Sequence, residues 1–490
     1  MEGYQTMMVK NRSDYTATIG IECHVQLKTK TKLFAAVRVA EFEDEPNTAI
    51  SQICLGMPGA LPVLNEAAVK MAARAAYALN TEPQPVSKFD RKHYFYPDLP
   101  KGYQITQFDQ PIILGGHVNI NLDGESKKIK ITRAHLEEDA GKTIHPPGKD
   151  YSLVDLNRAG TPLLEIVSEP DMHSAEEARA FAHELYLLMR YADVSDADLY
   201  QGNMRFDVNV SVSKDPKKLG TRSETKNLNS FRSVEKATEF EIDRQIEALE
   251  KGKKIVQETR GWNEAKQKTF SQRSKEDAHD YRYFPEPDVP PLNLEKSFID
   301  EAKKDFPEMP NDLRAKLRQL DLDDSAVETL VEEIVAGKFI QQVIEKTDNK
   351  IAKRIANWLT SDVQGLVAKG SANWSDLKLE LSAFEELAKN TLDNKISSTN
   401  AKQVVEEIVI NGGDSMVIAE QKNLLQVSDE AEIQEKVTIV LEQNPQAVTD
   451  LKAGQEKVIG FLVGQVMKLS KGQADPKLTQ ELIRRLVNEK

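Results

Sequence analysis

The amino-acid composition of the chain changes abruptly near residue 292, and this change restricts the folds that the chain can adopt. All 12 tyrosines, all eight histidines, both cysteines and 17 of the 21 prolines precede that point. Residues 1–292 hold short alternating apolar runs separated by Gly/Pro loops, a pattern typical of a mixed sheet. The later part is rich in Lys, Glu, Ala and Leu at helical spacing. We therefore expect an α+β domain followed by an all-helical part.

The helical part is expected to divide once more. Apolar residues recur at helical spacing through residues 295–405, and a glycine-containing turn at residues 411–414 precedes a last helical segment. The sequence thus predicts three domains, at residues 1–292, 293–411 and 412–490.

Composition and charge exclude several classes of protein. No run of about 18 apolar residues occurs, so no membrane-spanning helix is expected. The polar segment Met1–Tyr15 lacks the apolar core of a signal peptide. Two cysteines do not build a disulfide framework, and we expect a cytoplasmic location. A net charge of −13 argues against general nucleic-acid binding, so any such contact needs a local basic patch.

Two strand-like runs carry ionisable side chains. Residues Thr18–Leu27 have apolar side chains at every second position, which predicts a half-buried strand. Its other face then presents Glu22 and His24 side by side. The second run, Pro162–Val167, encloses Glu165 among apolar residues, and a buried carboxylate needs a cation nearby.

Between these runs lies Arg133–Lys142, with three consecutive acids at Glu137, Glu138 and Asp139. Three carboxylate-bearing segments and one imidazole suit a hard divalent cation, for which Mg²⁺ with nucleotide phosphate is the usual occupant. The competing interpretation is a solvated strand face, and the residues alone leave both open.

Further elements of the first domain follow from periodicity. A third strand is predicted at Arg205–Val212, where four polar residues share one face: Arg205, Asp207, Asn209 and Ser211. Such a face is as often merely solvated as functional. Helices are expected at Asn65–Asn80 and, capped by Ser230, at Phe231–Leu249.

Familiar nucleotide-binding loops are missing from the sequence. Gly141-Lys142-Thr143 looks like the end of a phosphate loop, but Leu136 replaces the glycine required five residues earlier. No G-x-G-x-x-G occurs either. If the chain uses ATP, it does so without these loops.

Two segments interleave aromatic residues with arginine and proline, at Phe89–Asp98 and Asp280–Asp288. Such segments either stack bases and clamp phosphates or form an aromatic-proline turn that closes the edge of a domain. Taken alone, the residues favour the turn.

Together, these segments resemble one family closely, the B subunits of the bacterial aspartyl-tRNA(Asn)/glutamyl-tRNA(Gln) amidotransferases. The resemblance covers essentially the whole chain in a single order. The matching stretches are Ile19–Leu27, Leu55–Leu64, Phe89–Pro111, Arg133–Lys142, Ser152–Asp171, Thr225–Ser230, Gln257–Arg260, Asp280–Asp288 and Gly454–Pro476.

The resemblance implies a carbon–nitrogen ligase with glutamine as amido donor, active in a heterotrimer whose other members are an amidase, the A subunit, and a small C subunit. The B subunit of this family uses ATP to phosphorylate the side-chain carboxylate of Glu-tRNA(Gln) or Asp-tRNA(Asn). Ammonia channelled from the amidase then displaces the phosphate, because a free carboxylate is a poor electrophile. The alternatives are a stand-alone ligase like glutamine synthetase, which would not need the helical half, and a tRNA-binding scaffold without catalysis.

The resemblance also assigns residues. The expected catalytic and Mg²⁺-binding residues are Glu22, His24, Glu138 and Glu165. The residues expected to contact ATP are Lys92, Asp139 and Arg205. The first domain is expected to resemble the glutamine synthetase sheet, which binds ATP without a glycine loop. The tail is expected to resemble the YqeY family and to contact tRNA through its basic segment Gly454–Lys490, which has seven Lys/Arg against four acids.

Some members of this family bind zinc through two cysteine pairs, and this chain lacks that ligand set. The matching positions hold Ala35, Val37, Ser51 and Cys54, and a single thiol does not make a tetrahedral site. We expect elemental analysis of the purified protein to find no stoichiometric zinc. One zinc per chain that survives dialysis would contradict this expectation.

Overall fold

The chain forms two compact units, residues 1–309 and 310–490. The computed structural model describes residues 12–122, 124–274, 280–426, 430–470 and 472–489. The first unit extends beyond the composition break at residue 292, because α4 (Lys296–Lys303) packs against α1 (Glu66–Ala78). The predicted boundary therefore lies inside this unit and not at its end.

A mixed sheet is the frame of the first unit, and the predicted α+β fold is confirmed. Within the described residues it has nine strands in the order β14-β13-β12-β11-β1-β10-β7-β5, with β6 also paired to β7. Within the part of the chain described, β12 and β13 are the only adjacent strands of this sheet that run parallel to each other. Its strands are β1 (Thr16–Gln26), β5 (Ile113–Leu114), β6 (His117–Leu122), β7 (Glu125–Glu138), β10 (Pro162–Ser168), β11 (Met204–Ser213), β12 (Ser223–Leu228), β13 (Glu258–Asn263) and β14 (Lys268–Ser274).

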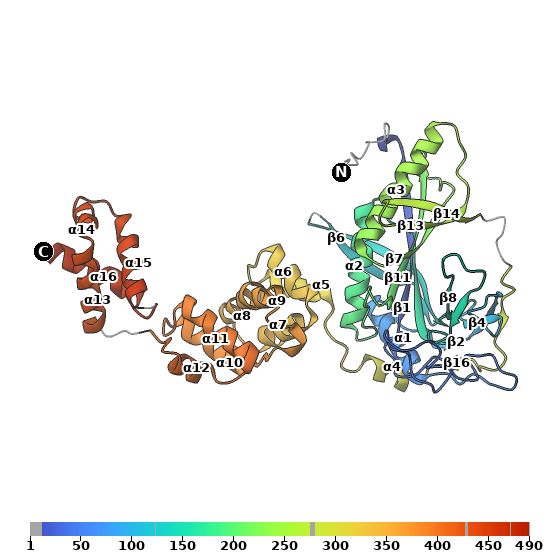
Figure 1. Ribbon diagram of the computed structural model, residues 1–490, viewed down its shortest axis with the longest axis horizontal. Helices are drawn as coiled ribbons and strands as arrows, with labels where there is room; N and C mark the ends of the chain where they lie inside the picture. The colour runs from blue at the N-terminus through green and yellow to red at the C-terminus, as the bar shows by residue number, and fades with distance from the viewer. Residues whose placement is uncertain (1–11, 123, 275–279, 427–429, 471, 490) are drawn as a thin grey trace. The chain divides into compact units, whose positions relative to one another are not determined.

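Short strands form small sheets beside this frame. Figure 1 shows β4 and β8 on one side of the main sheet and α2 and α3 on the other. The small sheets pair β2 (Val86–Ser87) with β16 (Leu292–Asn293), β8 (Lys142–Ile144) with β9 (Leu153–Asp155), and β3 (Asp90–His93) with both β4 (Tyr103–Thr106) and β15 (Phe284–Pro285).

The main core lies between the sheet and the helices α1, α2 (Ala175–Tyr191) and α3 (Phe231–Glu250). Burial alternates strictly along β1, as its sequence predicts. The predicted helices are confirmed as well: α1 begins after Asn65, and Ser230 caps α3, as predicted, by accepting a hydrogen bond from the backbone N–H of Ser233. One face of the sheet is thus covered by helices, and the other is left for polar side chains.

The second unit is helical. Among its described residues, α12 packs on α10 and α11, so the predicted turn at residues 411–414 lies inside one bundle. A separate apolar cluster begins at Ile433. Its α-helices are α5 (Pro310–Arg318), α6 (Asp324–Glu332), α7 (Ile334–Lys346), α8 (Asn349–Asn357), α9 (Gln364–Ala368), α10 (Leu381–Leu392), α11 (Ser398–Asn411), α12 (Ser415–Gln421), α13 (Glu430–Gln443), α14 (Pro445–Lys452), α15 (Val458–Leu469) and α16 (Pro476–Glu489).

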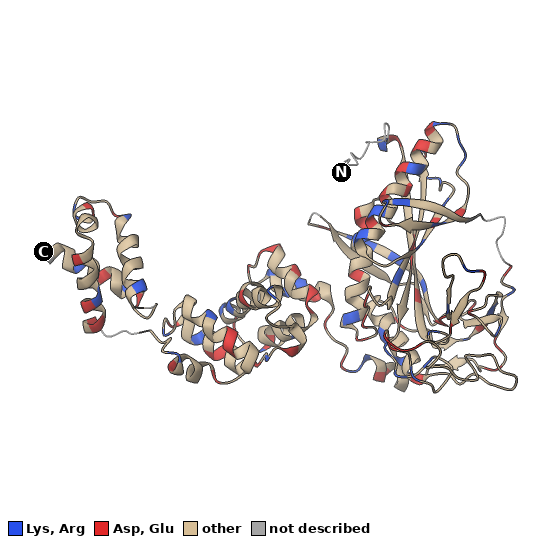
Figure 2. Ribbon diagram, in the orientation of Figure 1, with Lys and Arg blue, Asp and Glu red and all other residues tan. Residues whose placement is uncertain are grey.

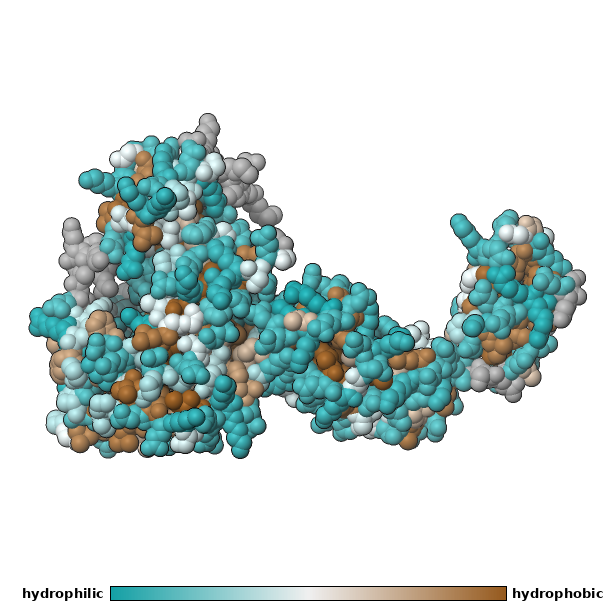
Figure 3. Space-filling view, turned by 180° about the vertical axis from the view of Figure 1, so that it is seen from behind, coloured by the Kyte–Doolittle hydropathy of each residue, from teal (hydrophilic) through white to brown (hydrophobic). Residues whose placement is uncertain are grey.

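The surface carries mixed charge and scattered apolar spots. Figure 2 shows acidic and basic residues side by side on the helices of the second unit, and Figure 3 shows hydrophilic residues over most of the face in view. Among the helices described, none combines the length and apolar character that crossing a membrane requires.

Glu241 on α3 ties this helix to three strands. Its carboxylate is fully buried and accepts hydrogen bonds from Ser223 Oγ at 2.6 Å and from Thr269 Oγ1. Two guanidinium groups complete the network, Arg244 Nη2 at 2.7 Å and Arg260 Nε at 2.9 Å. Burial alone would raise the pKa of Glu241, yet these donors outweigh burial and hold the pKa below its usual value.

We expect Glu241→Gln to destabilise this region by about 3 kcal/mol, because the buried Arg260 and the partly exposed Arg244 lose a counter-charge. Glu247→Gln on the same helix should have little effect, since Glu247 is exposed and pairs only with the exposed Lys251 among the contacts described. Amide hydrogen exchange in β12 and β13 measures the opening free energy. Equal protection in both variants would contradict the assignment.

The contribution of Glu241 to stability depends on pH in a defined direction. The folded-state pKa of Glu241 is depressed, so its contribution to stability is complete above the unfolded-state value of about 4.3. That contribution is lost as the pH falls through the folded-state pKa. The difference in protection between the wild type and Glu241→Gln should therefore shrink on acidification.

Candidate active site

Four adjacent strands carry one row of polar side chains across the sheet. Antiparallel pairing places Arg205 of β11 opposite His24 of β1. It also places His24 opposite Glu165 of β10, and Glu165 opposite His135 of β7. Directly opposed side chains on antiparallel strands lie about 5 Å apart. The row faces away from α2 and α3, because the apolar residues of β1 point toward those helices.

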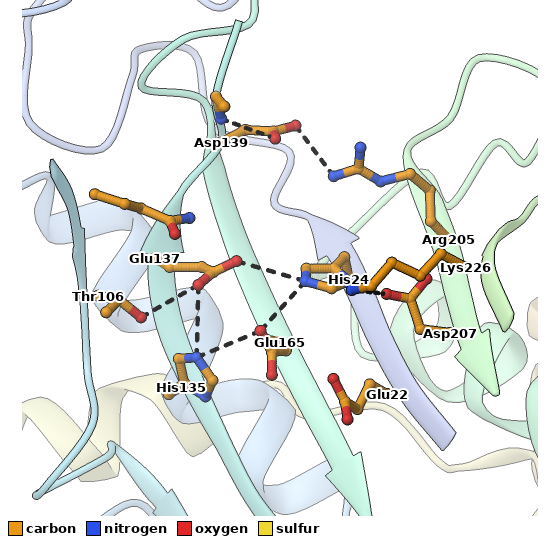
Figure 4. A network of polar contacts seen from close by, with 12 residues as sticks. Glu22, His24, Thr106, His135, Glu137, Asp139, Glu165, Arg205, Asp207 and Lys226 are labelled. Carbon is orange, nitrogen blue, oxygen red and sulfur yellow. Dashed lines mark hydrogen bonds and ion pairs between the residues drawn. The ribbon is translucent and has the colours of Figure 1, made fainter. Parts of the chain in front are cut away.

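His24, Glu137 and Glu165 converge on this face, as Figure 4 shows. His24 Nε2 lies 3.2 Å from Glu165 Oε2 and 3.6 Å from Glu137 Oε1. His135 Nε2 lies 3.6 Å from Glu137 Oε2 and 3.7 Å from Glu165 Oε2. Thr106 donates its hydroxyl to Glu137 Oε2 at 3.2 Å. We call the three convergent residues the carboxylate–histidine group; one donor atom from each lies within 4.8 Å of the others.

The charges of this group compensate one another. Burial alone would lower the pKa of His24, but the hydrogen bond and the charge of Glu165 outweigh burial and raise it to about 9. Burial alone would raise the pKa of Glu137 and of Glu165. The adjacent His135 and His24 nevertheless hold the pKa of each carboxyl below its usual range. Two ionised carboxylates are therefore kept side by side, a state that is concentrated at functional sites.

Three predicted ATP-contacting residues surround the group. Burial alone would lower the pKa of Lys92, but the negative charge of Glu137 and then of Glu165 outweighs it and raises the pKa. Arg205 Nη2 donates to Asp139 Oδ2 at 3.2 Å. Both cationic side chains thus belong to the same electrostatic neighbourhood.

Glu22 lies beside the carboxylate–histidine group. Its Oε1 accepts a hydrogen bond from Asn209 Nδ2 at 3.1 Å. Burial, and then the charge of Glu165, raise its pKa. Glu22 also lines a cavity of about 400 Å³ on the same face, together with Thr18, Gly20, Asn209, Ser211, Gly220, Thr221, Arg222 and Gln257.

Glu138 was expected at this site, but it is not part of the carboxylate–histidine group. Consecutive residues of a strand point to opposite faces, and Glu138 follows Glu137 at the end of β7. Its Oε1 pairs with Lys101 Nζ and accepts the backbone N–H of Ile105 at 3.0 Å. The structure therefore places Glu137, and not Glu138, beside His24.

A bulge in β7 determines which of the two adjacent glutamates faces the site. Ile131 pairs with Ser168 and Arg133 pairs with Val167, so Thr132 is an extra residue in the ladder. Ile129 and Ile131 point to the core, and uninterrupted alternation from them would put Glu138 on the site face. The bulge shifts the alternation by one residue and brings His135 and Glu137 to that face. The available signal was the spacing of His135 and Glu137, two residues apart like Glu22 and His24.

The polar face of β11 has specific partners and is not merely solvated. Arg205 contacts Asp139, and Asn209 contacts Glu22. Asp207 accepts a hydrogen bond from Lys226 Nζ at 3.1 Å. These side chains are therefore engaged by their neighbours and do not form a merely solvated face.

The two aromatic segments pair with each other through β3 and β15. His93 and Phe284 stack at 5.0 Å between ring centroids. Arg91 binds Glu286 through two hydrogen bonds of 2.8 Å. The guanidinium and these two rings are thus engaged within the fold, whereas Phe95 and Tyr96 are exposed.

Comparison with known proteins agrees with this architecture. The family model described as the GatB/GatE catalytic domain matches residues 17–300. A second model, described as the GatB domain, matches residues 338–487. The first match contains every residue of the carboxylate–histidine group.

Full-length relatives match along almost the entire chain. A protein of Persephonella marina is 45% identical over 476 residues, covering 97% of this chain and 100% of its own. One of Caldicellulosiruptor saccharolyticus is 45% identical, covering 96% and 98%, and one of Crocosphaera subtropica is 43% identical, covering 97% and 98%. All three are named as the B subunit of an aspartyl/glutamyl-tRNA(Asn/Gln) amidotransferase. The chain therefore belongs to the family of aspartyl/glutamyl-tRNA(Asn/Gln) amidotransferase B subunits.

Proposed function

We propose that this chain activates and amidates the side-chain carboxylate of a mischarged tRNA, Glu-tRNA(Gln), Asp-tRNA(Asn) or both. The activation consumes ATP and gives an acyl phosphate, and ammonia then displaces the phosphate. The carboxylate–histidine group carries the proposal, because ionised carboxylates around one point are what a phosphoryl-transfer site needs to hold a divalent cation. A tRNA-binding scaffold without catalysis would have no need of this costly arrangement.

The residues present fit Mg²⁺. Two carboxylates and one imidazole offer donor atoms within 4.8 Å of one another. Glu137, Glu165 and His24, the last after releasing its proton, would hold the ion, with Glu22 beside them. When bound, Mg²⁺ would neutralise phosphate charge during transfer.

The chain's own cations have matching roles. Arg205 and Lys92 flank the group, and their positive charge would orient the phosphates of ATP and oppose the charge that develops during transfer. Asp139 fixes the Arg205 guanidinium through the contact at 3.2 Å. Arg205 would thus be held in place before substrate binds, which reduces the entropy lost on binding.

Ammonia is proposed to come from a separate amidase, the A subunit, in a complex that also contains the small C subunit. No Ser/His/Asp signature of an amidase is visible in this sequence. The chain alone should therefore form no amide from glutamine. The assembled complex should accept either glutamine or free ammonia.

Glu137→Gln should reduce amide formation by the complex about a hundredfold or more, with glutamine or with ammonia, because one carboxylate of the phosphate-facing group is lost. Glutamine hydrolysis by the amidase should continue. Glu138→Gln is the matched neighbour, and it should keep the binding of Mn²⁺, a spectroscopic substitute for Mg²⁺, that Glu137→Gln weakens.

The measurements are amide formation on each mischarged tRNA and Mn²⁺ titration followed by electron paramagnetic resonance. Full activity of Glu137→Gln would refute the site. Loss of Mn²⁺ binding in Glu138→Gln alone would return the ligand role to Glu138. Amide formation from glutamine by the isolated chain would refute the division of labour.

The tail is proposed to bind tRNA through its basic segment, residues 454–490. Fewer of its basic side chains are available than the sequence indicates, because two arginines pair with acidic residues. Arg484 pairs with Glu456 and Arg485 with Glu430, each at 2.7 Å. Lys457, Lys468 and Lys477 are the remaining basic residues of this segment that the structure describes.

Deleting residues 427–490 should raise the apparent KM for aminoacyl-tRNA several-fold and change kcat less, because the lost contacts hold substrate away from the reacting carboxylate. The salt dependence of tRNA binding should also become shallower. Titration of mischarged tRNA at two salt concentrations tests both effects. Unchanged KM and slope would mean that the tail makes some other contact.

A further inference from the structure

A buried amine and a thiol face each other in the first unit, apart from the residues to which the proposed function gives a role. Lys32 is fully buried, and its Nζ lies 3.6 Å from Cys54 Sγ. The same Nζ donates to the backbone carbonyl of Ala159 at 2.6 Å. Ser51 Oγ lies 3.3 Å from the sulfur. Two nucleophilic groups of different chemistry are thus held in contact by neighbours that fix both.

The backbone encloses this pair. Gly160 has φ of +82°, and a Cβ atom there would lie 3.4 Å from Lys32 Cδ and 3.6 Å from Cys54 Sγ. The turn therefore packs directly on both side chains. Burial lowers the pKa of Lys32, although the adjacent Cys54 opposes the effect. A lowered pKa increases the fraction of neutral amine, which is the nucleophilic form.

We propose that Lys32 and Cys54 are an oxidative modification site that forms a covalent bond between Nζ and Sγ. A peroxide first oxidises the Cys54 thiol to a sulfenic acid and is itself reduced to water. The neutral Lys32 amine then attacks the sulfur. The S–O bond breaks, and the departing hydroxide takes one proton from nitrogen and leaves as a second water. Thiol, amine and hydrogen peroxide thus give one sulfenamide and two water molecules.

The surroundings of the pair suit this product. The sulfenamide nitrogen keeps one hydrogen, so it can still donate to the Ala159 carbonyl. The bond would close the loop between residues 32 and 54, which includes the exposed acidic residues Glu41, Glu43 and Glu45. Because Lys32 and Cys54 are covalently joined only through that loop, a cut within it separates them unless the cross-link is present.

The experiment uses the full chain, treated with hydrogen peroxide and then with a thiol-blocking reagent. Digestion with a protease specific for glutamate cuts the loop. We expect mass spectrometry to find a Lys32 peptide linked to a Cys54 peptide, lighter than their sum by two hydrogen atoms and separated by dithiothreitol. Cys54→Ser should abolish the link. Cys23→Ser, at the other buried cysteine, should leave it in place.

A second variant separates chemistry from folding. Lys32→Arg keeps a cation but replaces the amine with a guanidinium, which stays protonated and is a poor nucleophile. In that variant, Cys54 should oxidise without forming a link. If Lys32→Arg does not fold, the peptides of the unmodified chain still decide the question. Cys54 found as a free thiol or as an unlinked sulfinic acid, beside an intact Lys32, would overturn the proposal.

Discussion

The central constraint on the first unit is the burial of Glu137 and Glu165 side by side. Two ionised carboxylates in a poorly solvated place repel each other and lose hydration, so positive charge has to surround them. Two strands meet that requirement, because β1 supplies His24 and β3 supplies Lys92, while His135 of β7 contacts both carboxylates. The pairing of β1 with β10 places His24 opposite Glu165, while Lys92 comes from the small sheet of β3, β4 and β15.

The sheet separates two tasks by its two faces. The face toward α1, α2 and α3 is apolar and provides the free energy of burial, while the opposite face holds ionisable groups that would be unstable in a core. This separation gives the site a rigid base: its side chains project from long strands and not from flexible loops. It also explains how a proposed ATP site can exist without a glycine-rich loop, since the charged groups come from strand register.

Periodicity made part of this structure predictable. β1, α1 and α3 follow from local patterns and caps, which depend on neighbouring residues only. The place of Glu137 does not, because the bulge at Thr132 depends on how β7 pairs with β10. The end of the first unit could not be predicted from local sequence either, since it depends on α4 packing against a helix more than 200 residues earlier. Family resemblance supplied the expected chemistry, and only the fold could select between adjacent glutamates.

The bulge at Thr132 determines which residues at the end of β7 face the proposed site. A one-residue insertion or deletion anywhere between Ile131 and Glu137 would exchange the two faces of the strand end, exposing Glu138 to His24 and turning Glu137 away. Such a change would also turn Ala134 and Leu136 out of the core and His135 into it, so folding and the proposed site both disfavour it. Length variation along this lineage is therefore expected to be confined to loops, while the residue count from the bulge to the end of β7 stays fixed.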